Sequence, residues 1–300
     1  MGWAGRPPAA RRRITPPFRD RVSRYPVTVL PPPKVILFDW HATLVDTHEA
    51  MYHAVDDILV KFGDLGLLER MTRPGESKTA EDARLVDYVR EYQKLHPKIK
   101  AEQKISRTDI FEVLFDSDEE AKAIAHEEFN KCYRNHFGEI HPFEDGIEDM
   151  LIRLHRWGIK LGVLTNRDRE FLEHEIRVIH VTGWAHLFDT IVCGGDIVKR
   201  KPAPDPVLKA LENLGVEPGP DCWYVGDSTT DTAAAKEAGV TSVFYNGAHW
   251  DDAWLDKIFP GTEKHPHKPD AVVNNFRELI QLVDECMNAE LMSRSSDQAR

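Results

Sequence analysis

The sequence alternates between two hydrophobic patterns, and each predicts a different kind of element. Short apolar runs bounded by polar or turn residues predict strands buried on both faces. Apolar residues three and four positions apart predict helices that pack through one face. The first apolar run, residues 35–38, stops at Asp39, a carboxylate at the carboxyl end of a predicted strand. Open α/β sheets bind ligands at that end, although an Asp there could also begin a turn or cap a helix.

From residue 142 onward the two patterns take turns. The predicted strands are 160–165, 190–193, 222–226, 241–245 and 271–273, and the predicted helices are 146–157, 168–179, 206–214, 231–238 and 276–287. Such alternation with short connections favours an α/β fold with a Rossmann-like, doubly wound and mostly parallel sheet. We expect residues 34–46 and 142–288 to form this core.

Residues 47–141 interrupt the alternation and show little strand character. Apolar spacing predicts helices over 48–62 and 117–137, and Ser106 to Asp109 has the spacing of a capping-box helix start. The sequence therefore predicts an α-helical domain inserted directly after the first strand.

Both ends of the chain differ from this pattern. Residues 1–33 are rich in Pro and Arg without sustained periodicity. Residues 289–300 form a short segment that ends in a mostly polar run from Ser293 to Arg300. We expect the first segment to be a disordered or loosely packed extension and the second to be a disordered tail.

Composition narrows the range of partners. The formal net charge is −11 although the first 34 residues are strongly basic, so the rest of the chain is acidic and no specific binding of nucleic acid is expected. Neither a secretory signal nor a membrane-spanning run is present in the sequence, and its four cysteines are widely scattered. These features predict a cytoplasmic protein with reduced cysteines and no membrane partner, and they leave the oligomeric state open.

Polar groups recur at or near the ends of the predicted strands. In chain order they are Asp39, then Thr165 with Asn166, then Lys201, and then Asp227 with Asp231. Asp, Thr, Lys and Asp-x-x-x-Asp in this order resemble the four motifs of the haloacid dehalogenase-like hydrolase superfamily. The resemblance covers roughly residues 35–280 and follows the phosphoglycolate-phosphatase-like branch of that superfamily, in which the helical insertion corresponds to a mobile cap that closes over the site.

The resemblance implies a phosphatase with Mg²⁺ as its cofactor. Asp39 would attack phosphorus to give an aspartyl-phosphate, which water then hydrolyses. The ion would be held by the side chains of Asp39 and Asp227 and by the backbone carbonyl of His41, with Asp231 as a ligand or as support. Oxygen ligands of this kind suit Mg²⁺.

The same resemblance assigns the phosphate-binding groups. Thr165 and the backbone around Asn166 would bond the phosphoryl oxygens, and Lys201 would neutralise charge on Asp39 and on the transferring group. The expected substrate is a small phosphorylated metabolite, which the sequence does not identify further.

One position departs from the family pattern. The family's phosphatases carry a second Asp two residues after the nucleophile, followed by Gly and Thr, whereas this chain has His41, Ala42 and Thr43. That Asp protonates the leaving oxygen and then deprotonates the attacking water. Because an imidazole with an ordinary pKa of about 6.5 can do both, we expect His41 to be the acid/base group.

Two other functions remain open. Trp40 after the nucleophile and the lack of the second Asp also resemble phosphonoacetaldehyde hydrolase, whose cap lysine forms a Schiff base; Lys78 lies at about the right distance from Asp39 in the sequence. The neighbouring charges in 70–84 also fit a solvated segment. The other possibility is a catalytically weak protein that binds a phosphorylated ligand.

The connection 246–269 is long for this fold and contains His249, His265 and His267. A zinc site is conceivable from the His-x-His spacing, but a loop at the surface or rim is the preferred interpretation.

Overall fold

The computed structural model describes residues 30–298 except residues 74, 103–106, 137 and 264–265. Most of the predicted basic extension, Ser106 of the capping box, His265 and the last two residues lie outside the described residues.

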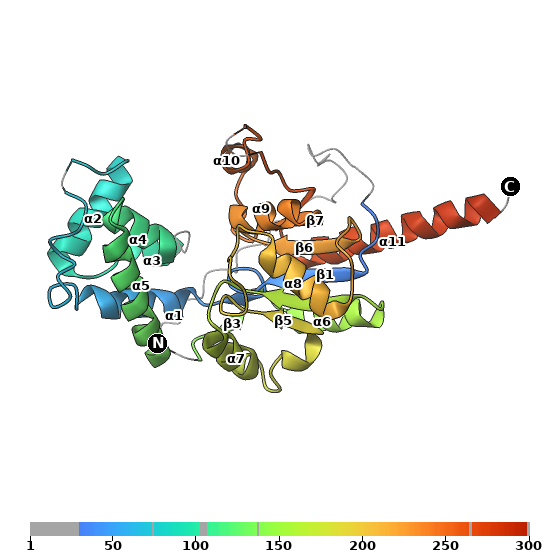
Figure 1. Cartoon of the computed structure of the whole chain (residues 1–300), viewed down its shortest axis with the longest axis horizontal. Coiled ribbons are helices and arrows are strands. Elements are labelled where there is room, and N and C mark those ends of the chain that lie inside the picture. Colours follow the sequence, from blue (N-terminus) through green and yellow to red (C-terminus); the bar gives the residue numbers. More distant parts are fainter. Residues whose placement is uncertain (1–29, 74, 103–106, 137, 264–265, 299–300) are drawn as a thin grey trace, which may run out of the picture.

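A sheet of six parallel strands lies at the centre of the α/β body (Figure 1). Its strands, in spatial order, are β5 (Thr190–Val192), β4 (Lys160–Leu164), β1 (Val35–Asp39), β6 (Cys222–Gly226), β7 (Thr241–Tyr245) and β8 (Ala271–Val273). This order confirms the predicted doubly wound α/β fold. The chain runs from β1 to one edge and then crosses back to β6, and such a reversal opens a crevice at the carboxyl ends of the central strands.

Helices cover both faces of the sheet (Figure 1). The helices of the body are α6 (Ile147–Arg156), α7 (Arg169–Val178), the short η2 (Ala185–Leu187), α8 (Asp205–Leu214), α9 (Thr229–Glu237), α10 (Asp252–Ile258) and α11 (Phe276–Gln298). One buried cluster joins α6, α7 and α11 to the sheet, and a second joins α8 and α9 to it.

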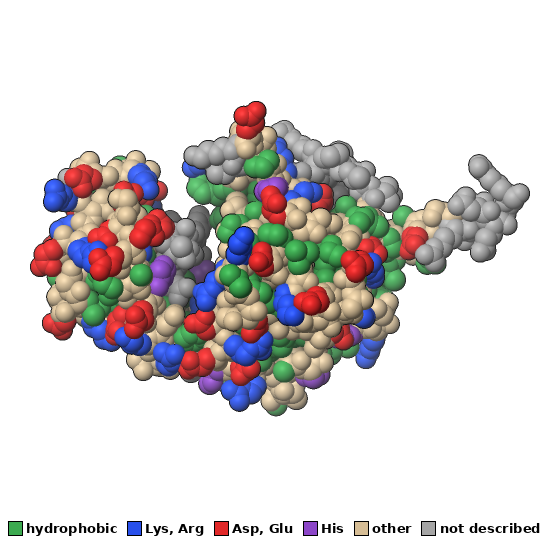
Figure 2. Space-filling model, in the orientation of Figure 1, with side chains coloured by type: hydrophobic (Ala, Val, Ile, Leu, Met, Phe, Trp, Pro, Cys, Tyr) green, Lys and Arg blue, Asp and Glu red, His purple; other side chains and the backbone are tan. Residues whose placement is uncertain are grey.

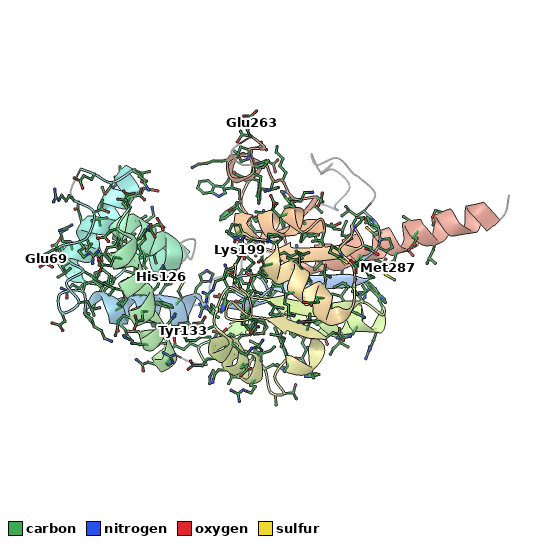
Figure 3. The ribbon with its side chains drawn as sticks, viewed as in Figure 1. Glu69, His126, Tyr133, Lys199, Glu263 and Met287 are labelled. Carbon is green, nitrogen blue, oxygen red and sulfur yellow. The ribbon has the colours of Figure 1, made fainter. Side chains whose placement is uncertain are left out.

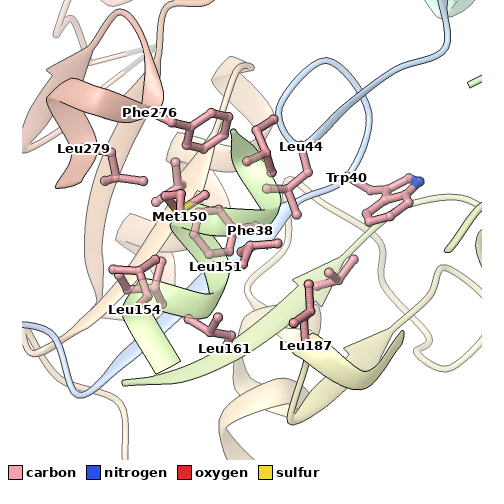
Figure 4. Packing of buried hydrophobic residues seen from close by; sticks show 14 of the residues in the cluster. Phe38, Trp40, Leu44, Met150, Leu151, Leu154, Leu161, Leu187, Phe276 and Leu279 are labelled. Carbon is pink, nitrogen blue, oxygen red and sulfur yellow. The ribbon is translucent and has the colours of Figure 1, made fainter. Parts of the chain in front are cut away.

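The first cluster fixes the strand that ends at Asp39. Phe38 lies among Met150 and Leu151 of α6 and Phe276 of α11 (Figure 4), and its ring centroid is 6.4 Å from that of Phe276. Burying side chains of this size stabilises the fold by about 1.5–3 kcal/mol each. The residue that follows Phe38 is therefore held at a defined place on the sheet edge.

The helical insertion packs around a hydrophobic cluster of its own. It enters through β2 (Val45–Asp46) and leaves through β3 (His141–Pro142), which pair antiparallel. Between them lie α1 (His48–Leu59), α2 (Ala80–Tyr92), α3 (Pro97–Glu102), α4 (Arg107–Phe115), α5 (Glu119–Tyr133) and the short η1 (Arg134–His136). Because β1 leads directly into β2, the insertion stands off the carboxyl edge of the sheet, and Figure 2 shows a hollow between it and the body.

The apolar spacing did not predict α2. This helix begins after Thr79, whose hydroxyl accepts a hydrogen bond from the Asp82 amide at 3.0 Å. Only Leu85, Val86 and Val89 are buried in it. So few apolar positions in a charged stretch give a weak periodic signal, whereas the cap that starts the helix is a local feature.

Two predicted irregular segments contain helix. The connection 246–269 includes α10, which is capped by Asp251 and buries Leu255. The predicted disordered tail from residue 289 instead continues α11 through Gln298. Ala289 to Met292 are good helix formers, so a helix already anchored by its first turns can extend through them.

The predicted extension, residues 1–33, also reached too far along the chain. Leu30 joins the buried cluster of the body, and the indole Nε1 of Trp223 donates a hydrogen bond of 3.2 Å to the carbonyl of Pro31. The packed body therefore already includes residues 30–33. Among the described residues, none of the helices has both the length and the hydrophobicity needed to cross a bilayer.

Candidate active site at the sheet edge

The site is built on the carboxyl end of β1. Asp39 pairs in register with Leu164 of β4, and the preceding Phe38 pairs with Val225 of β6. Gly226 therefore lies level with Asp39, and Thr165 and Asp227 each lie one residue beyond that level on either side. The parallel register brings together groups that are far apart in the sequence.

Lys201 lies at the centre of this group. Its ammonium donates to Asp39 Oδ1 at 2.7 Å, to Asp231 Oδ1 at 2.7 Å and to the hydroxyl of Tyr224 at 2.9 Å. Its side chain is only 5% exposed. Burial works against the charged ammonium, but the carboxylates of Asp231 and Asp39 outweigh it and raise the pKa of Lys201. The residue is a buried cation at neutral pH.

Negative charge still exceeds positive charge here. Burial raises the pKa of Asp39 to about 6 despite the neighbouring Lys201, and burial together with Asp39 and Asp231 raises the pKa of Asp227 well above its usual range. Carboxylate oxygens of Asp39, Asp227 and Asp231 lie within 4.8 Å of one another. An all-oxygen set with unbalanced negative charge fits a hard divalent cation such as Mg²⁺.

Asp231 is already occupied by protein groups. Its Oδ2 accepts hydrogen bonds from the backbone amide and hydroxyl of Ser228, which caps α9, and its Oδ1 accepts from Lys201 and Tyr224. Four donors match the roughly four acceptor sites of a carboxylate. The contacts of Asp231 therefore favour a supporting role and leave Asp39 and Asp227 as the carboxylates better placed to hold an ion.

The backbone of Gly226 lies close against the carboxylate of Asp231. A Cβ atom at Gly226 would lie 2.5 Å from the carboxyl carbon of Asp231, so no other residue fits there without displacing it. On the other side, the hydroxyl of Thr43 donates to Asp227 Oδ1 at 3.2 Å.

The side chains of Thr165 and Asn166 both have structural partners, and those of Asn166 belong to Lys201. The amide of Asn166 exchanges two hydrogen bonds with the backbone of Lys201, one through Nδ2 at 3.1 Å and one through Oδ1 at 3.0 Å. The hydroxyl of the buried Thr165 accepts from the amide of Arg167 at 3.2 Å. Asn166 thus holds the loop that presents the ammonium, a role that sequence reasoning did not assign to its side chain.

A match to a family model decides the family. A family model described as haloacid dehalogenase-like hydrolase matches residues 36–245, which is most of the chain. The chain belongs to the haloacid dehalogenase-like hydrolase family.

Relatives within this family carry phosphatase names. The chain is 29% identical over 211 residues to a phosphoglycolate phosphatase of Xanthomonas campestris pv. campestris, a match that covers 70% of this chain and 82% of the relative. It is 38% identical over 116 residues to a phosphoglycolate phosphatase of Xylella fastidiosa, which covers 39% of this chain and only 49% of the relative. These relatives support the phosphoglycolate-phosphatase-like branch of the haloacid dehalogenase-like family.

Solved structures show the same fold. The crystal structure of CbbY from Rhodobacter sphaeroides in complex with phosphate is similar with a TM-score of 0.52 at 24% identity, and the match covers 84% of this chain and 99% of that chain. At this identity the similarity supports the fold of the family alone.

His41, which replaces the family's second Asp, is packed against protein groups through both ring nitrogens. Its Nδ1 lies 2.9 Å from the hydroxyl of Thr47, and its Nε2 lies 3.4 Å from Glu175 Oε2. Proton transfer to a leaving oxygen would require one of these nitrogens to exchange its partner for the substrate.

Ala42 follows in a left-handed conformation with φ of 57°. An L-residue pays roughly 1–2 kcal/mol there, which explains why Gly is the usual residue of the family at this position. Since Ala42 donates its amide to the carbonyl of Val45 at 2.8 Å, the turn after the nucleophile keeps its bonded form despite the strain.

Glu175, on α7, was missed by sequence reasoning. This carboxylate is 1% exposed and accepts hydrogen bonds from Trp40 Nε1 at 2.8 Å and from the Tyr133 hydroxyl at 2.6 Å, with Arg167 Nη1 at 3.6 Å. Burial raises its pKa although Arg167 opposes the shift. Glu175 therefore connects the nucleophile loop to the end of α5, where Figure 3 labels Tyr133 at the junction of insertion and body.

A sequence signal for this residue did exist. Phe171, Leu172, Glu175 and Ile176 are the buried positions of α7, so Glu175 occupies the apolar stripe of an amphipathic helix. A carboxylate at such a position needs buried partners, and here these partners come from three other segments of the chain.

Lys78, the lysine of the alternative reaction, lies in the insertion just before α2. Its ammonium pairs with Asp116 at 2.7 Å, and its side chain is 73% exposed. In Figure 1, α2 lies in the part of the insertion that faces away from the sheet. An exposed lysine that pairs with a carboxylate gives the Schiff-base reaction no support.

Proposed function

We propose that the protein is a Mg²⁺-dependent phosphatase that hydrolyses a small phosphate monoester through an aspartyl-phosphate at Asp39. The observation that carries this proposal is the 2.7 Å contact between Asp39, at the end of the central strand, and the buried ammonium of Lys201. A carboxylate aligned beside a fixed cation is what nucleophilic attack on a phosphoryl group requires. Family membership and the names of the relatives support the same reaction.

The proposed reaction has two steps. In the first, a carboxylate oxygen of Asp39 bonds to phosphorus while the bond from phosphorus to the leaving oxygen breaks and that oxygen takes up a proton. In the second, water attacks phosphorus, which releases inorganic phosphate and restores Asp39. Lys201 stabilises the charge on the transferring group in both steps, and Thr165 with the backbone around Asn166 bonds its oxygens.

Asp39, Asp227 and the backbone carbonyl of His41 would hold Mg²⁺, with Asp231 in support. When bound, the ion supplies positive charge beside the phosphoryl oxygens. The fit rests on the carboxylate oxygens within 4.8 Å of one another and on the raised pKa of Asp227.

We assign the acid/base role to His41. Glu175 faces Nε2, so a protonated imidazole would direct its Nε2 proton toward Glu175 and carry a second proton on Nδ1, where the Thr47 hydroxyl now lies. Exchange of Thr47 for the leaving oxygen would let the Nδ1 proton pass to that oxygen in the first step. The neutral Nδ1 would then take a proton from the attacking water in the second step, which restores the protonated imidazole.

Residues 47–141 are proposed to act as a cap over the sheet edge and to select the phosphorylated metabolite. The hollow between insertion and body (Figure 2) leaves room for this movement. We place the enzyme in the cytoplasm, since its four cysteines are free and buried, as in reduced proteins.

A screen of phosphate monoesters with and without Mg²⁺ tests the proposal, and 2-phosphoglycolate is the first substrate to try because of the relatives' names. Turnover should disappear in excess EDTA and return when Mg²⁺ is restored. Asp227→Asn should need a higher Mg²⁺ concentration for half-maximal rate. Turnover that is insensitive to EDTA would contradict the metal assignment, and binding of monoesters without turnover would support a binding protein instead.

A further inference from the structure

A second group of metal-binding side chains lies away from the sheet edge, where the insertion joins the body. His53 and Asp57 lie one turn apart on α1, His136 is the last residue of η1, and Glu139 lies just before β3. Glu139 is placed between the two imidazoles: its Oε2 is 2.7 Å from His53 Nδ1, and its Oε1 is 3.3 Å from His136 Nδ1. The two imidazole centroids are 5.3 Å apart.

The geometry is close to that of a zinc site. One ligand atom from each of His53, His136 and Glu139 lies within 4.8 Å of the others. Ligand atoms at about 2.0–2.2 Å from a tetrahedral Zn²⁺ ion are roughly 3.4 Å apart, so small side-chain rotations would bring all three onto one ion. Two imidazole nitrogens and a carboxylate oxygen suit Zn²⁺ better than Mg²⁺, which prefers oxygen ligands throughout.

Asp57 supplies what such a site needs behind its ligands. Its carboxylate lies 2.8 Å from His136 Nε2, the ring nitrogen that faces away from Glu139. Carboxylates that bond the distal nitrogen of a ligating histidine fix its tautomer and orientation, and they strengthen metal binding. His136 is thus oriented from one side while its other nitrogen faces the proposed ion.

We propose that His53, His136 and Glu139 form a binding site for Zn²⁺ or a similar transition-metal ion, with Asp57 orienting His136. Water can complete the coordination, since the His53 side chain is 51% exposed. Because α1 follows β2 after Thr47, and Ile140 alone separates Glu139 from β3, an ion here joins the segments by which the chain enters and leaves the insertion. Because all three ligands belong to the insertion, bound metal would hold these two segments together and stabilise the base of the insertion. This site is independent of the proposed reaction at Asp39.

Cobalt(II) distinguishes this site from the carboxylate centre. A four-coordinate site with imidazole ligands gives visible cobalt absorption much stronger than a six-coordinate oxygen site does. We expect the full-length protein, saturated with Mg²⁺ to occupy the carboxylate centre, to bind one equivalent of Co²⁺ with intense absorption and to release it when Zn²⁺ is added. Calorimetric titration with Zn²⁺ should give the same stoichiometry, and a separate thermal unfolding experiment should give a higher melting temperature when Zn²⁺ is bound.

Variants locate the ion. His53→Ala and His136→Ala should each weaken Zn²⁺ binding at least tenfold and remove the cobalt absorption, and Asp57→Ala should weaken binding about 10-fold to 100-fold. His180→Ala is the matched control, because His180 is also 51% exposed and pairs with a single carboxylate, Glu148, at 2.8 Å. Absence of the cobalt absorption in the wild type, or Zn²⁺ affinity unchanged in both His53→Ala and His136→Ala, would overturn the proposal and leave the cluster as a network of hydrogen bonds.

Discussion

Two lysines illustrate the difference between the sheet edge and the helical insertion. Lys201 is 5% exposed and contacts two carboxylates and a phenol, whereas Lys78 is 73% exposed and pairs with Asp116 at the surface. Charges interact strongly where water is excluded and weakly where solvent screens them. The body therefore holds a fixed cation beside Asp39, while this charged pair of the insertion is free to rearrange.

Replacement of Lys201 should have the largest effect, because it removes the buried cation beside Asp39. In Lys201→Met, kcat should fall by roughly 10²–10³-fold, because the transferring group loses a fixed positive charge. The variant should also unfold more easily, by about 3 kcal/mol, because buried carboxylates lose their partner. Lys199→Met is the control, since this exposed lysine belongs to the same loop and is labelled in Figure 3. Similar kcat values for both variants would contradict a special role for Lys201.

Replacement of His41 tests whether its side chain is the acid/base group. His41→Ala should reduce kcat for alkyl phosphates by about 10²-fold or more, since their leaving oxygen needs a proton. The loss should be much smaller for nitrophenyl phosphate, whose leaving oxygen hardly needs one. Steady-state rates with the two substrates decide the question. Equal losses would mean that His41 shapes the loop only through its backbone.

Glu175 joins the two regions, because it bonds Trp40 of the body and Tyr133 of the insertion. Glu175→Gln keeps the size of the side chain but removes the charge that faces His41, and kcat for alkyl phosphates should fall by about 10-fold. The ratio of alkyl to nitrophenyl rates should fall with it, an effect that general destabilisation does not produce.

Tyr133→Phe serves as its control. This change removes one hydrogen bond to Glu175 and leaves the His41 contact in place, so it should lower stability by about 1 kcal/mol without changing the substrate ratio. An altered ratio in Tyr133→Phe but not in Glu175→Gln would show that the cap contact, rather than the charge near His41, affects the reaction.

The smallest effect is expected at Lys78. Lys78→Met should change phosphatase kcat less than about twofold, because solvent already screens this charge. Borohydride reduction in the presence of phosphonoacetaldehyde, followed by peptide mass analysis, should find no adduct at this lysine. An adduct at Lys78 would instead favour cleavage of a carbon–phosphorus bond.

The sequence predicted most of the body because its strands are buried on both faces. The apolar runs over 222–226, 241–245 and 271–273 match β6, β7 and β8 residue for residue. Their order confirms the fold, and the polar residues that follow them point to one edge. Local hydrophobic patterns thus predict the bounds of a strand well when every residue of a short segment is buried.

The same patterns hide polar groups inside apolar elements. Tyr224 and Glu175 fall within a predicted strand and a predicted helix, yet each bonds side chains from distant segments. Periodicity indicates which face is buried but carries no information about partners that only the tertiary fold brings close. The helix α2 was missed for the opposite reason, because it buries too few residues to produce a clear period.

The proposed reaction requires that Asp39 become phosphorylated, and this intermediate can be trapped. The protein is mixed with Mg²⁺ and a hydrolysed monoester, quenched in acid within one turnover, and treated with borohydride, which reduces an acyl phosphate but not a free carboxylate. Peptide mass analysis should find the reduced side chain at residue 39 in the wild type and no such product in Asp39→Asn, which should be folded and inactive. Reduction at another carboxylate, or undiminished hydrolysis by folded Asp39→Asn, would contradict the account.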